Sequence, residues 1–224
     1  MGAGKVAVTS IRIALLSLSA LVATPGAGAG EKAASPDKLG AFTQDSDIGD
    51  VKQKGSTTFD ARTGTYRVVG NGDDLWAAKD DFHFVSRRAT GNIAITATVT
   101  PVVSSNEPHS KAGLMVRQDL SADSPYADIV VHQNGLVALQ YRETRGGSTH
   151  EIDTPHTGPG RFQLIRRGDY VSISIANADG KLRPASGLVL LKLHAPYYVG
   201  LLVCSHSDTK TTTDDFTAVG ITRP

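Results

Sequence analysis

Short runs of apolar and β-branched residues, separated by glycine, asparagine, aspartate or proline, recur along the chain from about Phe42 onward. In several runs apolar and polar positions alternate, so that Ile93, Ile95, Ala97 and Val99 would share one face of a strand. A period of two is typical of a strand with one buried and one solvated face. No helical period stands out after the first forty residues. The pattern therefore predicts an all-β fold.

About a dozen strands are expected on this basis. They are Thr57–Phe59, Thr65–Val69, Phe82–Val85, Asn92–Val103, Lys111–Arg117, Tyr126–Gln133, Leu136–Arg142, Phe162–Arg166, Tyr170–Ile175, Leu188–Leu193, Tyr198–Cys204 and Asp215–Thr222. The turns Gln133-Asn134-Gly135 and Arg167-Gly168-Asp169 join neighbouring runs and indicate antiparallel hairpins. So many short strands favour two stacked sheets, that is, a sandwich or jelly roll.

The N-terminus has the pattern of a signal peptide. Lys5 and Arg12 precede or begin an apolar stretch from Ile13 to Ala23, and Ala27-Gly28-Ala29 has the small-residue pattern of a cleavage site. The apolar stretch is shorter than the roughly 20 residues that a spanning helix needs. We therefore predict a signal peptide over residues 1–29, a flexible leader over 30–41 and one domain over 42–224. A membrane anchor is the less favoured alternative.

Composition narrows the choice of partners. The net charge is +1 and falls to −1 when Lys5 and Arg12 leave with the signal peptide, so there is no basic field to attract nucleic acid. Cys204 is the single cysteine, so no internal disulfide can form, and its apolar surroundings in the sequence predict a buried, inert thiol. We expect a secreted monomer without a membrane span, held together by its hydrophobic core.

Four stretches, taken together, carry a family resemblance. They are Asp47-Ile48-Gly49 with Gly55-Ser56 and Phe59-Asp60; residues 70–76 with 80–85 and Gly91-Asn92; residues 111–117 with 120–127; and residues 198–203 with Ser205-His206. Over about Asp45 to Thr222 the chain resembles a bacterial family of concanavalin A-like (jelly-roll) domains, of the DUF1349-like or LamG-like kind. The resemblance implies a two-sheet sandwich with a concave face, found in secreted carbohydrate-associated proteins.

The chain departs from that family in two places. Lys181-Leu182-Arg183 follow Asp179-Gly180, where the family often has an aromatic residue. Phe216-Thr217-Ala218-Val219 stand where the family often has Phe-Asp-Asn-Val. The first difference weakens the expectation of an aromatic sugar platform there, and the second removes a carboxylate that could have bound calcium.

Glycoside hydrolysis needs two carboxyl groups on either side of one sugar. Jelly-roll glucanases that resemble this fold place acids at alternating positions of one strand, and no such run occurs here. Glu107, Glu143 and Glu151 fall at loops or strand ends, far apart in the sequence. Asp80-Asp81 and Asp214-Asp215 are adjacent, so in a strand they would point to opposite faces. A glycosidase is therefore not favoured.

Basic and aromatic residues could instead serve a polysaccharide lyase or a ligand site; they are Arg117, His132, Tyr141, Arg142, Arg166 and His206. Alternation places Arg117 on the face of Lys111 and Met115, and Gln140 and Arg142 on one face of the next hairpin. These residues are either the solvated face of a sandwich or a binding site. If a site exists, Arg117, Gln140 and Arg142 carry it, because planar side chains with several donors suit paired hydroxyls or a carboxylate.

Two further ligand candidates are Trp76 and His206. Trp76 is the only tryptophan, and a sugar-binding protein would use it as an exposed stacking surface. Its neighbours Leu75 and Phe82 equally favour a place in the core or at its edge. Both alternatives stay open on the sequence alone.

Metal sites have weak support. The seven histidines lack ligand spacing, and one cysteine cannot build a zinc site. A structural calcium ion could use Asp47, Asp73 and Asp215, which lie in acidic stretches. Turn chemistry explains the same residues without a metal.

We expect a secreted, non-catalytic binding module that recognises a carbohydrate on its concave sheet. The alternatives are a polysaccharide-active enzyme, either lyase or glycoside hydrolase, and a protein-interaction or structural module.

Overall fold

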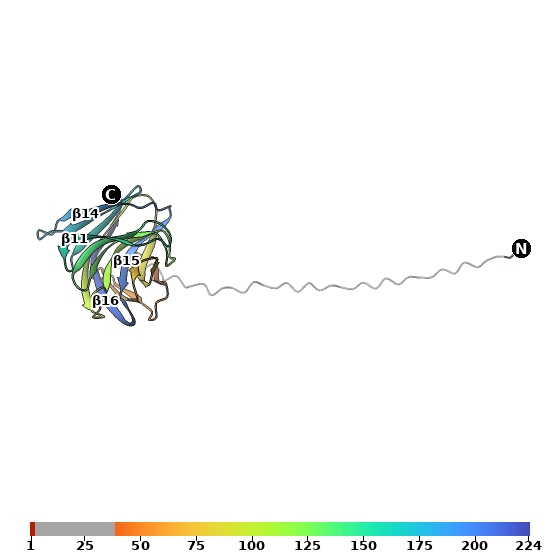
Figure 1. Cartoon of the computed structure of the whole chain (residues 1–224), viewed down its shortest axis with the longest axis horizontal. Helices are drawn as coiled ribbons and strands as arrows, with labels where there is room; N and C mark the ends of the chain where they lie inside the picture. Colours follow the sequence, from red (N-terminus) through yellow and green to blue (C-terminus); the bar gives the residue numbers. More distant parts are fainter. Residues whose placement is uncertain (3–38) are drawn as a thin grey trace. The chain divides into compact units, whose positions relative to one another are not determined.

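The computed structural model describes residues 1–2 and 39–224, apart from the side chain of Ser186. The predicted signal peptide, beyond its first two residues, and most of the predicted leader lie outside the described residues. Residues 39–224 form two seven-stranded antiparallel sheets and one short hairpin (Figure 1). The predicted all-β antiparallel sandwich is confirmed. In the described part of the chain, no helix is both long and apolar enough to cross a membrane.

The first sheet, here sheet A, has the strand order β1-β6-β15-β8-β9-β10-β11. Its strands are β1 (Gln44–Ile48), β6 (Phe82–Ala89), β15 (Tyr197–Cys204), β8 (Lys111–Arg117), β9 (Tyr126–His132), β10 (Leu136–Arg142) and β11 (His150–Thr157). All neighbouring pairs are antiparallel. Consecutive strands β8 to β11 lie side by side, so the chain builds this half of the sheet as a meander.

The second sheet, here sheet B, has the order β14-β13-β12-β7-β16-β3-β2. Its strands are β14 (Leu182–Leu190), β13 (Tyr170–Ala176), β12 (Arg161–Arg167), β7 (Ile93–Val103), β16 (Ser207–Thr222), β3 (Thr65–Gly72) and β2 (Ser56–Asp60). The separate hairpin consists of β4 (Leu75–Trp76) and β5 (Lys79–Asp80).

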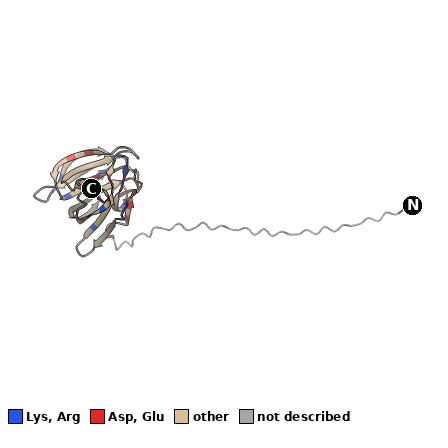
Figure 2. Cartoon of the chain, turned by 60° about the horizontal axis from the view of Figure 1, so that its bottom comes forward, with Lys and Arg blue, Asp and Glu red and all other residues tan. Residues whose placement is uncertain are grey.

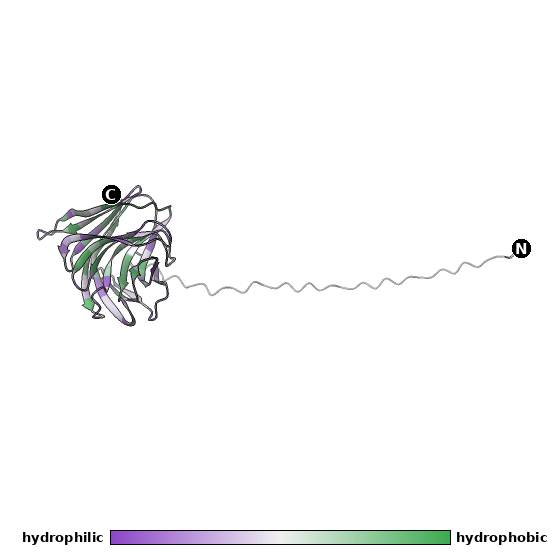
Figure 3. Cartoon of the chain, viewed as in Figure 1, coloured by the Kyte–Doolittle hydropathy of each residue, from purple (hydrophilic) through white to green (hydrophobic). Residues whose placement is uncertain are grey.

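The main core lies between the two sheets, where apolar strand positions face one another (Figure 3). The alternation in the sequence is confirmed, because Ile95, Ala97 and Val99 of β7 and Val171 and Ile173 of β13 are all buried in this core. The hairpin turns at Gly135 and Gly168 have φ angles of 92° and 58°, which glycine adopts without strain. Period-two patterning thus selects the inward face of the central strands.

A second apolar cluster covers part of the outer face of sheet A. It consists of Ile48, Leu75, Phe82, Phe84, Met115, Tyr126, Val130, Leu202 and Cys204. Leu75 comes from the β4–β5 hairpin, so the hairpin packs onto a sheet face that a simple sandwich would leave to solvent. Every residue of β8 and β9 is buried, with inward side chains in the main core and several outward ones in this second cluster. Burial raises the pKa of the Cys204 thiol to about 12, and the prediction of a buried thiol is confirmed.

The two edge strands of sheet A were not among the expected strands. β1 and β11 carry many charged or polar residues, and β11 also contains Pro155. Edge strands tolerate such residues because one side of their backbone makes no ladder hydrogen bonds. Leu39, which falls in the predicted leader, is 3% exposed and packs in the main core.

One carboxylate of sheet B faces the interior. Asp214 lies two residues before the buried Phe216 on β16 and is 5% exposed. Its burial, with the nearby charge of Asp215, raises its pKa to about 7. A carboxyl group whose pKa is higher in the folded than in the unfolded state is protonated preferentially in the folded state. Stability should therefore fall as the pH rises from about 4 through 7.

We expect the Asp214→Asn substitution to raise the free energy of unfolding at pH 8 by about 2–4 kcal/mol and to have little effect at pH 4. Urea unfolding across this pH range measures the difference. Asp208→Asn, at an exposed position of the same strand, is the matched control and should change stability by less than about 0.5 kcal/mol. Equal effects of both substitutions at pH 8 would contradict the role of burial.

Candidate functional site

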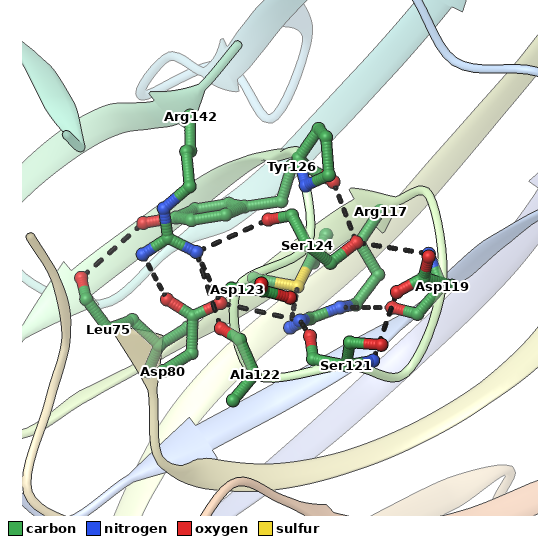
Figure 4. A network of polar contacts seen from close by, with 12 residues as sticks. Leu75, Asp80, Arg117, Asp119, Ser121, Ala122, Asp123, Ser124, Tyr126 and Arg142 are labelled. Carbon is green, nitrogen blue, oxygen red and sulfur yellow. Dashed lines mark hydrogen bonds and ion pairs between the residues drawn. The ribbon is translucent and has the colours of Figure 1, made fainter. Parts of the chain in front are cut away.

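The β4–β5 hairpin is fixed to sheet A by one buried carboxylate. Asp80 is fully buried, and Arg142 binds it with two hydrogen bonds, from Nη2 to Oδ1 at 2.6 Å and from Nη1 to Oδ2 at 2.9 Å (Figure 4). Arg117 donates from Nη2 to the same Oδ2 at 3.3 Å. The paired geometry of Arg142 is the strong, planar form of an arginine–carboxylate contact. We call Asp80, Arg117 and Arg142 the Asp80 cluster.

The two guanidinium groups also bind the loops around the hairpin. Arg142 donates to the carbonyl of Ala77 from Nε and Nη2, and Arg117 donates to the carbonyl of Asp119 at 2.7 Å. Each guanidinium carbon lies 5.1 Å from the centre of an aromatic ring, Phe82 for Arg117 and Tyr126 for Arg142. The Asp80 cluster therefore joins β8, β10, the β4–β5 hairpin and the loop after β8 into one packed unit.

Arg117 and Arg142 are predicted ligand residues, but in the structure their side chains bind the buried Asp80. They share the outer face of sheet A with Gln140, as alternation predicts, but both side chains are 0% exposed. Their donors are used by Asp80 and by backbone carbonyls. Their shared charged partner, Asp80, lies 37 residues from Arg117 and 62 residues from Arg142 in the sequence.

Beyond the hairpin, polar side chains gather on the outer face of β8 to β11. Asp128, Gln140 and Glu151 face one another across three strands, and Lys111 pairs with His132 on β8 and β9. Cross-strand partners point to the same face of a sheet. We call these five residues the outer-face cluster.

Several buried polar atoms of the outer-face cluster have no hydrogen-bond partner among the described residues. They are Asp128 Oδ2, Gln140 Oε1 and both ring nitrogens of His132. In most proteins the large majority of buried polar atoms are paired, so such a concentration on one face is unusual. It marks this face as the part of the described domain with the most unused hydrogen-bonding capacity.

Gln140 lies between the buried Asp128 and the exposed Glu151 on neighbouring strands. Its Nε2 donates to Glu151 Oε2 at 2.6 Å, which orients the carboxylate of the exposed Glu151. Burial raises the pKa of Asp128 well above its ordinary value, although the charge of Lys111 opposes this shift. Asp128 Oδ1 accepts a hydrogen bond from the backbone N–H of Gln140 at 3.3 Å. Gln140 thus lies between a buried carboxyl group and an accessible carboxylate.

Three histidines meet at one end of the outer-face cluster. The ring centres of His109 and His132 lie 6.0 Å apart, and those of His109 and His206 lie 5.4 Å apart. Burial, reinforced by the charge of Lys111, lowers the pKa of His132 to about 3, so its ring is neutral. Lys111 itself is paired with Asp74, at 2.9 Å from Nζ to Oδ1. The three histidines therefore offer rings for hydrogen bonds, whereas the adjacent Lys111 is already paired.

The histidine group was missed in the sequence because its members are far apart along the chain. His206 follows β15, His109 precedes β8 and His132 ends β9. These three strands are neighbours in sheet A, in the order β15-β8-β9, and antiparallel pairing brings the relevant ends together. Predicting the histidine group from the sequence would have required the order of the strands in sheet A.

The remaining predicted ligand residues lie around the outer-face cluster. Gln140 belongs to it, and His206 is 31% exposed at its edge, 3.8 Å from Asp74 Oδ2. Trp76 lies on β4 and is 41% exposed, so it is not a core residue.

The three predicted calcium ligands do not come together. Asp47 accepts hydrogen bonds from His83 and from the backbone of Gly55, and Asp215 forms a two-bond ion pair with Arg67. Asp73 is exposed after β3. Across the described ranges, no group of three or more histidine, cysteine, aspartate or glutamate side chains is arranged to hold a metal ion. The donor set does not fit a shared calcium site.

Removal of one member of the Asp80 cluster should strongly destabilise the domain. We expect Arg142→Ala to lower the free energy of unfolding by about 3–5 kcal/mol, because it leaves the Asp80 carboxylate buried with weaker compensation. Chemical unfolding measures the loss. The control is Arg145→Ala, which removes half-exposed ion pairs with Asp119 and Asp123 and should cost at most about 1 kcal/mol. A loss for Arg142→Ala no larger than that of the control would contradict this assignment.

A buried histidine on β6 binds the edge strand β1 of sheet A and also contacts Thr57 of β2 in sheet B. His83 is 2% exposed, and its ring nitrogens lie 2.7 Å from Asp47 Oδ1 and from Asp45 Oδ1. Burial disfavours the charged ring, but the hydrogen bonds and charges of the two aspartates outweigh it and raise the pKa of His83. Because the folded-state pKa lies above the unfolded value, the stabilisation is complete below pH 6.5 and is lost as the pH rises through the folded-state pKa.

His83→Gln should therefore lower stability by about 1–3 kcal/mol at pH 5.5 and by a smaller amount at pH 9. Thermal unfolding of both proteins at the two pH values tests this. His194→Gln, at an exposed loop position, serves as the control and should show no such pH dependence. A destabilisation that is independent of pH would show that His83 acts through packing and not through its charge.

The comparisons with known proteins establish the fold. A scan against protein-family models found no match, and a search of curated proteins also found none. Among solved structures, a functionally unknown protein from Saccharomyces cerevisiae is similar with a TM-score of 0.62 and 16% identity, over 81% of this chain and 97% of that one. The carbohydrate-binding module CBM66 from Bacillus subtilis is similar with a TM-score of 0.51 and 15% identity, over 81% and 96%.

A xylan β-1,4-xylosidase from Bacillus halodurans C-125 is similar with a TM-score of 0.54 and 13% identity, over 75% of this chain but only 34% of that protein. The match to this enzyme therefore concerns about a third of its length. At these identities the similarity is one of fold. The chain shares the two-sheet antiparallel β-sandwich fold of these structures.

Proposed function

We propose that this protein is a secreted, monomeric binding module that recognises a carbohydrate on the outer face of sheet A, beside the β4–β5 hairpin. The observation that carries the proposal is that this face presents an accessible carboxylate, Glu151, oriented by Gln140, and an exposed aromatic ring, Trp76, on the hairpin. Sugars offer many hydroxyl groups, each of which donates one hydrogen bond and accepts others. A hydroxyl-rich ligand therefore matches a face with an oriented, accessible carboxylate.

The exposed members of this region would make the first contacts. Glu151 is held by Gln140 through Oε2, which leaves Oε1 free to accept from a sugar hydroxyl. His206 offers a partly exposed ring, and Trp76 offers an exposed aromatic surface on the hairpin. Aromatic rings pack well against the apolar faces of sugar rings, and carboxylates fix the orientation of their hydroxyls.

The charges on this face favour a neutral sugar. Arg117 and Arg142 are neutralised by Asp80, and Lys111 is neutralised by Asp74. Lys79 of β5, opposite Trp76, is exposed and forms no salt bridge with a described residue, but the accessible carboxylate of Glu151 would repel a uronate. The same pairing weakens the lyase alternative, because that chemistry needs positive groups to stabilise the ionised sugar acid.

The fold supports a carbohydrate ligand as well. Solved structures that share it include a carbohydrate-binding module and a xylosidase, and the sequence resembles secreted LamG-like and DUF1349-like domains. The signal-peptide pattern at the N-terminus favours export. These features support the class of ligand, and the outer-face cluster supports its location.

Retention on a panel of neutral and acidic polysaccharides, combined with assays for reducing sugars and unsaturated products, tests the proposal. We expect retention on a neutral polysaccharide without product, and at least about tenfold weaker binding for Glu151→Ala and Trp76→Ala, which corresponds to about 1.4 kcal/mol each. Glu143→Ala, at another exposed glutamate between β10 and β11, should bind like the parent protein. The absence of retention on every glycan would refute the proposal, and product release would favour the enzyme.

A further inference from the structure

A pocket at one end of the sandwich lies apart from the outer-face cluster. Its volume is about 310 Å³, and its lining comes from the end of β6, the β6–β7 turn, the start of β7 and the end of β16. The lining residues with polar side chains are Arg87, Arg88, Thr90, Asn92, Thr222 and Arg223. The volume is at the lower end of the range for small-molecule sites, which is about 300–1,000 Å³.

The pocket and the outer-face cluster lie at opposite ends of the same strand. β15 begins with Tyr197 opposite Ala89 of the pocket, and it ends with Cys204 opposite Lys111 of the cluster. A ligand in the pocket would therefore be bound independently of the proposed sugar site.

Arginines in this pocket differ from most other arginines of the domain. Six described arginines elsewhere form salt bridges with aspartate; they are Arg62, Arg67, Arg117, Arg142, Arg145 and Arg183. Arg87, Arg88 and Arg223 form none with any described residue, and no acidic residue lines the pocket. Figure 2 shows that basic and acidic positions are both spread over the domain. Three cations without a counter-charge therefore line the pocket, although Arg87 and Arg88 are neighbours on β6 and Arg87 also donates to the carbonyl of Ala41 at 3.5 Å.

The turn that forms the pocket is held firmly in place. Arg166 donates from Nη1 to the carbonyl of Gly91 at 2.9 Å, and Tyr197 donates its hydroxyl to the same carbonyl. Asn92 accepts from the backbone of Gly168 through Oδ1 at 2.9 Å, which leaves its Nδ2 as a donor. A fixed turn lowers the cost of ordering donors when a ligand binds.

We propose that this pocket binds a tetrahedral oxyanion, a sulfate or phosphate group, either free or carried as an ester on a polymer. Guanidinium groups bind such oxygens through paired N–H donors, and Thr90, Thr222 and Asn92 add neutral donors. Three cations around one pocket match a divalent anion with several oxygens better than a single carboxylate. The ligand lowers the repulsion among the three arginines, which no residue of the pocket does.

Titration of the full chain with sulfate, phosphate and acetate at low ionic strength, followed by NMR or calorimetry, tests the proposal. We expect saturable binding of sulfate or phosphate and at least tenfold weaker binding of acetate. The double variant Arg88→Ala/Arg223→Ala should bind the oxyanion at least tenfold more weakly than the parent protein. Arg88→Lys should lose part of the affinity, because it keeps the charge without the paired donors.

Arg161→Ala is the matched control, since Arg161 is also exposed and forms no salt bridge among the described residues but begins β12, outside the pocket. It should bind like the parent protein. The absence of saturable oxyanion binding, an equal loss in the control, or equal affinity for acetate would each overturn the proposal.

Retention on dextran sulfate, compared with unsulfated dextran, distinguishes the sources of the group. Retention that is lost in the double variant identifies an esterified polymer, whereas binding of the free ions alone identifies a small anion. The double variant should retain the binding of neutral polysaccharide by the parent protein. A failure of the oxyanion site and a failure of the proposed sugar site are therefore separate results.

Discussion

The carboxylate of Asp80 determines which part of sheet A can meet a ligand. Arg117 and Arg142 project from the outer faces of β8 and β10, where they would otherwise be solvated charges. By binding Asp80 from both strands they hold the β4–β5 hairpin on the sheet, and Leu75 then closes a second apolar cluster beneath it. The outer-face cluster and the exposed Trp76 owe their positions to this covered surface.

A buried ion pair is weak evidence for stability by itself, because apolar residues of the same volume often stabilise a fold as well or better. The Asp80 cluster also fixes how the β4–β5 hairpin is oriented on the sheet. Its planar, two-bond contact sets one orientation of the hairpin, and the carbonyl groups around it use the remaining donors. The cluster also removes two positive charges from the face, as Asp74 does for Lys111. The result is a face with polar atoms to spare and little net positive charge.

The central strands could be predicted from the sequence because their inward positions alternate with a period of two, as in β7 and β13. The edge strands β1 and β11 could not, since half-solvated polar residues leave no such period. Alternation also placed Arg117, Gln140 and Arg142 on one face. It could not show that two of them are buried, because burial depends on a hairpin and a carboxylate far away in the sequence.

The arginines of the domain differ in whether an acidic residue compensates their charge. The overall charge is close to zero, so a basic site cannot be recognised from composition. Arg117 and Arg142 are among the most deeply buried charges, yet their charge is compensated by one carboxylate. Arg88 and Arg223 are exposed and form no salt bridge with a described residue. The pocket that they line contains no acidic residue. The capacity to attract an anion therefore depends on which cations lack a partner, and this is decided by strand order and not by the number of arginines.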